Sequence, residues 1–113
     1  MDSFKQFFIE EIIDSSTFVG QFDVGFDIRI RKKLRLVGLS AFGMNDEERN
    51  KAIAYIESLV RGKTIWCKTL PDKYRKYATV LGVMYIQDGD NILNVNDHLI
   101  EKEFAKLRTT EPD

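Results

Sequence analysis

The distribution of apolar residues in the first third of the chain predicts β-strands. Residues 4–13 are apolar and aromatic with interspersed charges, and residues 17–22 resume this composition after Asp14-Ser15-Ser16. Two strands joined by a turn account for this pattern. From residue 28 to residue 36 apolar and basic positions alternate, which indicates a strand with one buried face. Asp23-Val24-Gly25 supplies a hairpin turn before it.

A helix is predicted from Asn45 onward. Asn45 can cap the helix, and Glu48 lies three residues inside it, which is the spacing of a capping box. Apolar residues then recur at spacings of three and four, and Gly62 is typical of a helix end. The apolar stripe consists of Ala52, Ile53, Ile56, Leu59 and Val60.

Two further strands and a second helix complete the pattern. Residues 64–68 and 79–86 have strand composition, and the second of these turns back through residues 88–91. The last helix is predicted to begin near Asn96, with Leu99, Ile100 and Phe104 as its apolar stripe. This order of elements favours a mostly β fold, a five-stranded OB-type Greek-key barrel with two helices. We expect one domain over residues 1–108 and a flexible tail over residues 109–113.

Composition excludes several classes of protein. A chain of 113 residues is long enough for one hydrophobic core, and its single cysteine cannot form an internal disulfide. No secretory leader opens the chain and no apolar run approaches the ~20 residues of a membrane span, so we expect a cytoplasmic protein without a membrane partner. The lone His98 has no second histidine or cysteine at ligand spacing, so we expect neither a metal nor a cofactor.

Two segments resemble the staphylococcal nuclease family. Leu34-Arg35-Leu36-Val37-Gly38-Leu39-Ser40-Ala41 is similar to the family's R-L-x-G-I-D-x-P-E motif, and Asp72-Lys73-Tyr74-Arg75-Lys76-Tyr77 to its D-K-Y-G-R motif. Shorter matches at residues 13–17, 23–26 and 94–100 follow in the same order. The resemblance therefore covers most of the chain, and it implies the same barrel.

The resemblance also implies that the nuclease chemistry is lost. Active members of the family hold calcium with two aspartates, direct a glutamate toward the attacking water and place two arginines on the scissile phosphate. The corresponding positions here are Ser16, Ser40, Gly43, Arg35 and Lys76. Serine is a weak calcium ligand and glycine cannot act as a base, so only Arg35 retains its family residue. We expect no catalytic residue and no bound metal.

A basic strand and a basic loop predict a second type of site. Alternate residues of the strand would place their charges on one face about 7 Å apart, close to the spacing of phosphates in an extended strand. These residues are Arg29, Arg31, Lys33 and Arg35, and the loop adds Lys73, Tyr74, Arg75 and Lys76. Single-stranded nucleic acid would suit this combination. Alternating charges are also typical of a solvated sheet face, and 18 acidic residues are available to pair them.

Three functions follow, in order of preference. The first is a catalytically inactive interaction module that binds a protein, with Phe7, Phe8 and Phe42 as candidate anchors. Phe7 and Phe8 are adjacent, and a strand that buries one face leaves one of the two rings pointing outward. The second is a single-stranded nucleic-acid-binding OB domain. The third is a nuclease whose remodelled site takes metal ligands from Asp14, Asp46, Glu47 or Glu48. The size, and the similarity of residues 23–26 to small relatives from bacteria, plasmids and phages, favour a phage or mobile-element accessory protein in the host cytoplasm.

Overall fold

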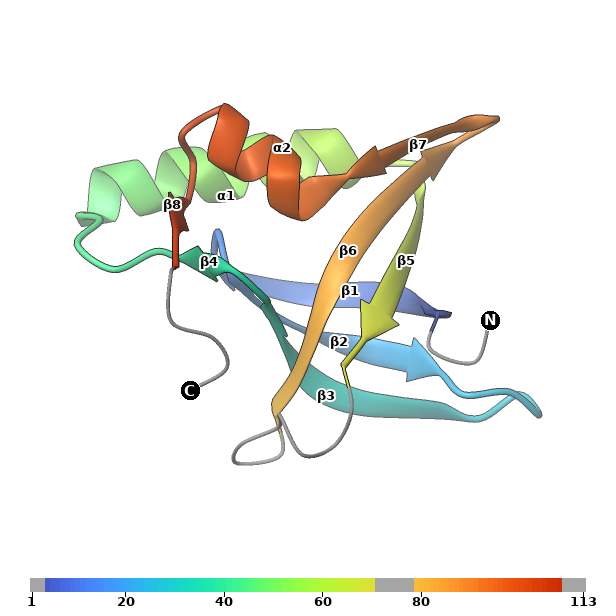
Figure 1. The fold of residues 1–113 in the computed structure, drawn as a ribbon. Helices are drawn as coiled ribbons and strands as arrows, with labels where there is room; N and C mark the ends of the chain where they lie inside the picture. The colour runs from blue at the N-terminus through green and yellow to red at the C-terminus, as the bar shows by residue number, and fades with distance from the viewer. Residues whose placement is uncertain (1–3, 71–78, 109–113) are drawn as a thin grey trace.

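Three antiparallel strands form the first half of the fold (Figure 1). The structure is a computed structural model, and it describes residues 4–70 and 79–108. The three strands are β1 (Phe4–Asp14), β2 (Thr17–Asp23) and β3 (Arg29–Leu36). The predicted turn between β1 and β2 is confirmed: the amide of Ser16 donates to Oδ1 of Asp14 over 2.8 Å. Strand register shifts near Glu11 and Ile12 bend β1, so that its first residues pair with a different strand from its last.

The predicted barrel closes through β5 (Thr64–Thr69) and β6 (Thr79–Asp88). Strand β5 pairs with both β1 and β6, and β6 then pairs in parallel with the second half of β3, from Lys33 to Leu36. These five strands form a closed mixed barrel of the OB type, as the sequence predicted. Two barrel positions have no room for a side chain: a Cβ on Gly20 would collide with the backbone carbonyl of Phe8, and one on Gly82 would lie 2.6 Å from Sγ of Cys67.

Helix α1 (Asp46–Val60) begins and ends where the sequence predicts. Oδ1 of Asn45 accepts from the amide of Glu48 at 2.8 Å, and Oε1 of Glu48 accepts from the amide of Asn45 at 3.0 Å, so both halves of the capping box are present. Gly62 follows the helix with φ at +74°, a conformation that glycine adopts without strain. Of the predicted stripe, Ala52 and Ile56 are fully buried.

The second helix, α2 (Val95–Glu101), is shorter than predicted and begins one residue earlier. Asn94 caps it, and the amides of Phe104 and Ala105 both turn back to the carbonyl of Leu99, so Phe104 lies beyond the helix. Neither described helix has both the length and the apolar composition needed to span a bilayer. Both helices lie together across one end of the barrel (Figure 1).

Three short strands were not anticipated. Strand β7 (Asn91–Asn94) forms a hairpin with β6, and β4 (Leu39–Ser40) pairs with β8 (Lys106–Leu107). Segments of two to four residues are too short to show a periodic pattern, which is why the sequence does not reveal them.

The core lies between the inner faces of the barrel and the two helices. Its largest fully buried side chains come from both parts of the fold: Phe7, Phe18, Leu34, Leu36, Leu39, Ile56, Met84 and Leu99. The predicted apolar face of β3 is only half correct, because Ile28 and Ile30 are 53% and 42% exposed. Among the described residues, β6 pairs with β3 from Lys33 to Leu36, and the first part of β3 and its hairpin extend away from this pairing (Figure 1).

Candidate functional site

Ser16 and Arg35, the first two positions compared with the nuclease site, lie beside each other. The carbonyl of Ser16 accepts a 2.8 Å hydrogen bond from the amide of Leu36, and Thr17 is the register partner of Arg35. Ser16 is buried, and its amide and hydroxyl both donate to Oδ1 of Asp14, at 2.8 and 3.0 Å. Ser16 and Asp14 therefore stabilise the turn between β1 and β2.

Ser40 and Gly43 lie on the segment that leaves β4. The hydroxyl of Ser40 accepts from the amide of Phe42 at 3.1 Å, which is a local turn contact. Gly43 has φ at +86°, and Nζ of Lys106 would lie 3.3 Å from a Cβ added there. A cation thus lies at the position compared with the catalytic glutamate. Lys76 lies outside the described residues.

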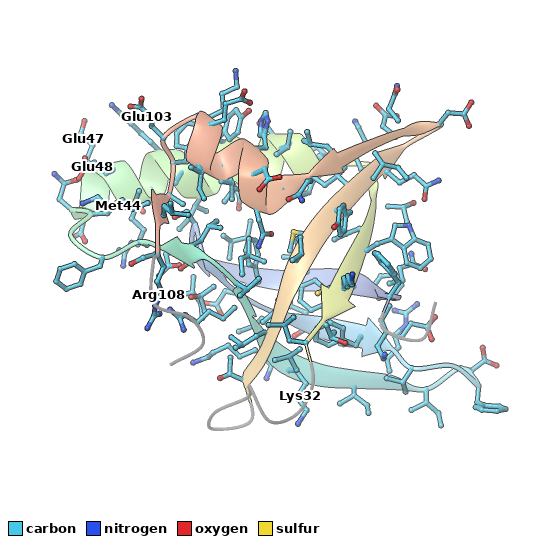
Figure 2. All side chains as sticks on the ribbon, in the orientation of Figure 1. Lys32, Met44, Glu47, Glu48, Glu103 and Arg108 are labelled. Carbon is cyan, nitrogen blue, oxygen red and sulfur yellow. The ribbon has the colours of Figure 1, made fainter. Side chains whose placement is uncertain are left out.

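The carboxylates proposed for a remodelled metal site contact groups of their own segments. Asp46 lies 3.4 Å from Arg49, Glu47 lies 3.6 Å from Lys51, and Glu48 belongs to the capping box. Figure 2 shows Glu47 and Glu48 projecting from the first turn of α1. Within residues 4–70 and 79–108, no group of three or more histidine, cysteine or acidic side chains could hold a metal ion.

The basic residues predicted to share one face of β3 lie opposite Lys32, on the outer face of the barrel, and some of them contact neighbouring side chains. Nε of Arg31 donates to Oε1 of Glu10 at 2.6 Å, and Gln21 donates to the other oxygen of Glu10, also at 2.6 Å. These hydrogen bonds, that of Arg31 first, lower the pKa of Glu10 below its ordinary value. One predicted phosphate ligand is therefore paired with a carboxylate of the same chain.

The other members of the basic strand differ in exposure. The guanidinium of Arg29 lies 3.8 Å from the ring centroid of Phe8, a cation–π contact. Lys33 is exposed and Arg35 is half-buried. The loop residues Lys73, Tyr74, Arg75 and Lys76 lie outside the described residues.

The three candidate anchor phenylalanines have different surroundings. Phe7 is 1% exposed in the core, so it is not available as a surface anchor. Phe8, its neighbour, lies on the outer face under Arg29, which agrees with the expectation that one of the two rings points outward. Phe42 is 86% exposed.

An apolar groove at the end of the barrel away from the helices was missed by the sequence analysis. It has a volume of about 180 Å³ and brings together the end of β2, the start of β3, the end of β5 and the start of β6. Its lining residues are Lys5, Phe22, Val24, Ile30, Lys32, Thr69, Leu70 and Val80. Figure 2 shows Lys32 at this end of the barrel. No described carboxylate lies within ion-pair distance of Lys32.

The tip of the β2–β3 hairpin was also missed. Phe26 is 96% exposed, and Ile28 beside it is 53% exposed, although the sequence indicated only a turn in this region. Alternation of apolar residues through Val24, Phe26, Ile28 and Ile30 was the available signal, since a pattern of this kind across a tight turn predicts one apolar hairpin face. We use the name mouth surface for the groove together with the exposed residues Val24, Ile28 and Ile30 beside it, and Phe26 at the tip lies outside this surface.

Two further residues with reactive side chains contact their surroundings inside the fold. His98 is half-buried, with Nε2 2.6 Å from the hydroxyl of Tyr55 on α1, so it links the two helices. Cys67 is a core residue, and burial raises the pKa of its thiol to about 12. A thiol of that pKa is protonated at neutral pH and is a poor nucleophile.

No protein-family model matches this chain, and no curated protein matches it.

Proposed function

We propose that this chain is a small, catalytically inactive binding module that holds a segment of a protein partner at the mouth surface. One observation carries the proposal: the apolar inner face of β2 and β3 continues out of the core into solvent. Phe22 is buried, while Val24 and Ile30, next to it in the groove, are 38% and 42% exposed. A contiguous exposed apolar patch of this kind is typical of a binding surface.

The groove favours an apolar side chain next to a carboxylate. Its volume of about 180 Å³ exceeds the ~150 Å³ of a cavity that accepts benzene, so one phenylalanine or leucine side chain fits. Lys32 lies at its edge without a described carboxylate partner, and Lys5 lines the same groove. We therefore propose a partner segment with an aromatic or aliphatic anchor flanked by aspartate or glutamate.

Descent from a staphylococcal nuclease-like ancestor is part of this proposal. The motif resemblance and the OB-type barrel support it, and the residues at Ser16, Ser40 and Gly43 favour a protein without the calcium chemistry. Retention of the barrel and loss of the ligands suit a module that now only binds. A phage or mobile-element accessory role in the host cytoplasm would fit a binding module of this size.

A peptide titration tests the binding site. The probe is a fluorescent peptide with one phenylalanine between two aspartates, and its control has serine in place of phenylalanine. We expect the probe to bind and Lys32→Glu to weaken binding at least ~10-fold, whereas the matched change Lys33→Glu, on the opposite face of β3, changes it less than ~2-fold. Equal effects of the two variants, or no binding at ~1 mM peptide, would reject the site.

Single-stranded nucleic acid is the second candidate ligand, and the outer face of β3 favours it. Arg29, Arg31 and Lys33 follow one another on that face, and the Phe8 ring beside them could stack on a base. Binding should weaken with added salt, because released counterions drive contacts with phosphates. We expect the double reversal Arg31→Glu and Lys33→Glu to abolish it, and unchanged affinity in that variant would exclude this candidate.

A further inference from the structure

The hairpin tip holds a fully exposed phenylalanine in a strained backbone conformation. Three consecutive residues, Gly25, Phe26 and Asp27, have positive φ values of 94°, 56° and 59°. Left-handed conformations cost a residue with a side chain about 1 kcal/mol or more, and a bulky aromatic residue is rarely found there. Strain of this kind persists where the surrounding structure imposes it, and it is concentrated at functional positions.

Hydrogen bonds at the base of the loop impose this conformation. The amide of Val24 donates to the carbonyl of Ile28 at 3.0 Å, and the amide of Ile28 donates to the carbonyl of Gly25 at 2.9 Å. Oδ1 of Asp23 also accepts from the amide of Gly25 at 2.9 Å. The tip is therefore built as a tight loop, and it presents Phe26 and Asp27 to solvent side by side.

The tip has the chemistry that the groove favours. Phe26 is an aromatic anchor, and Asp27 next to it has no ion-pair partner among the described residues. The groove combines an apolar lining with Lys32. The tip cannot turn back into the groove of its own chain, because Val24 and Ile30 of the same hairpin form one wall and the loop between them is closed by hydrogen bonds.

We propose that two copies of this chain form a symmetric dimer in which each hairpin tip occupies the groove of the other copy. Phe26 of one copy fills the groove, and Asp27 of that copy pairs with the partner's Lys32. A twofold axis makes the two contacts equivalent, which gives a closed, self-complementary interface. The inference rests on the proposed function, because it uses the same groove, and it adds regulation: the dimer occupies the site that a foreign segment would need.

The dimer should be weak. Each copy contributes its hairpin tip and the lining of its groove, which together hold fewer residues than the ~20–30 per partner of a standard stable interface. We therefore expect a dissociation constant of roughly 10–100 μM. Dissociation at low concentration would then open the groove for a protein partner.

Sedimentation equilibrium of the full chain over roughly 1 μM to 1 mM tests the dimer. We expect Phe26→Ser to raise the dissociation constant at least ~10-fold, and the matched control Phe42→Ser, which removes a ring that is 86% exposed elsewhere, to leave it unchanged. A wild-type chain that stays monomeric at ~1 mM, or equal effects of the two variants, would overturn the proposal.

Charge exchange tests the predicted pairing. Asp27→Lys and Lys32→Glu should each weaken the dimer, and the double variant should restore it, because the attraction is re-formed with opposite signs. Asp27→Asn separates the effect of charge from that of the backbone, since asparagine tolerates a positive φ. A double variant that is no stronger than the weaker single variant would overturn the pairing.

The probe peptide separates this inference from the proposed function. Phe26→Ser leaves the groove intact, so at dimer-forming concentrations it should bind the probe more tightly than the wild type does. A monomeric wild type that binds the probe through Lys32 would overturn the dimer and leave the proposed function standing. A dimer dependent on Phe26 with no probe binding by Phe26→Ser would support the dimer and overturn the foreign-partner role.

Binding of a monomeric chain to phosphatidylserine vesicles through Phe26 would overturn the dimer in favour of a lipid surface.

Discussion

Nε of Arg31 on β3 lies 2.6 Å from Oε1 of Glu10 on β1, and strand β2 separates their two strands. Because of this contact, Arg31 is paired with a carboxylate, and the basic residues of β3 are not a row of free cations. The side chains of Arg31 and Glu10 are 66% and 34% exposed, so the pair itself adds little to stability. Its significance is that it lowers the charge available to a phosphate at the centre of the predicted nucleic-acid surface.

The ion pair predicts a pH-dependent change in an Arg31 variant. The pKa of Glu10 should lie below its ordinary value of 4.5, and Arg31→Gln should raise it toward that value, because the largest cause of the shift is removed. The contribution of a carboxylate with a lowered folded-state pKa is present above pH 4.5 and is lost as pH falls through that pKa. The difference in free energy of unfolding between wild type and Arg31→Gln should therefore narrow on acidification. An NMR titration of Glu10 in both proteins measures the pKa, and equal values would contradict the prediction.

Asn96 should be the most sensitive polar residue of α2. It is 5% exposed; its Oδ1 accepts from the amide of Met84 at 3.0 Å and its Nδ2 donates to the carbonyl of Val37 at 2.9 Å. Asn96→Ala removes the partner of the buried Met84 amide and of the part-buried Val37 carbonyl, so we expect a loss of about 3 kcal/mol in the free energy of unfolding. The helix cap variant Asn94→Ala should cost only about 1 kcal/mol. Urea denaturation compares them, and equal losses would contradict a bracing role for Asn96.

Phe26 should contribute to binding at the expense of stability. We expect Phe26→Gly to raise the free energy of unfolding of the monomer by about 0.5–1 kcal/mol, because glycine adopts the positive φ without strain. Phe22→Ala, four residues earlier and buried, should lower it by about 4 kcal/mol. Denaturation at low protein concentration, where the dimer is dissociated, is the measurement. A destabilised Phe26→Gly variant would show that the ring supports the fold.

Calcium should not stabilise the chain. Ser16 and Ser40 supply no carboxylate, and the Ser16 hydroxyl donates to Asp14, so millimolar calcium should leave the melting temperature unchanged. A rise of several degrees would require a real site and would revive the remodelled nuclease. Differential scanning fluorimetry with magnesium as the control ion makes the comparison.

Restoring the nuclease residues should not restore hydrolysis of DNA. The variant that combines Ser16→Asp, Ser40→Asp, Gly43→Glu and Lys76→Arg supplies the family's side chains, but Gly43 has a φ of +86° and lies against Lys106. The backbone of a glutamate there would be strained, and its carboxylate would pair with Lys106 and not with the attacking water. Calcium-dependent cleavage of single-stranded DNA by the combined variant, absent from the wild type, would show that the site geometry survives.

The sequence by itself determined the elements whose signals are local. A capping box and a glycine stop set both ends of α1, because each acts through backbone groups within one helical turn. Apolar composition on either side of turn residues located β1 and β2, period-two alternation located β3, and the order of elements predicted the barrel.

Only the tertiary structure decided which parts of those elements are buried. The alternation along β3 has the same form at Ile30 and at Leu34, yet Leu34 pairs with Val80 of β6 and is fully buried, whereas Ile30 is 42% exposed. Burial depends on contacts between residues far apart in sequence, and no local period encodes where a neighbouring strand begins. The hydrogen bond from Asn96 to the carbonyl of Val37 also depends on tertiary structure, because the two residues are 59 positions apart in the sequence. The apolar groove, with Phe26 exposed beyond it, likewise combines residues of β1, β2, β3, β5 and β6 that are far apart in sequence.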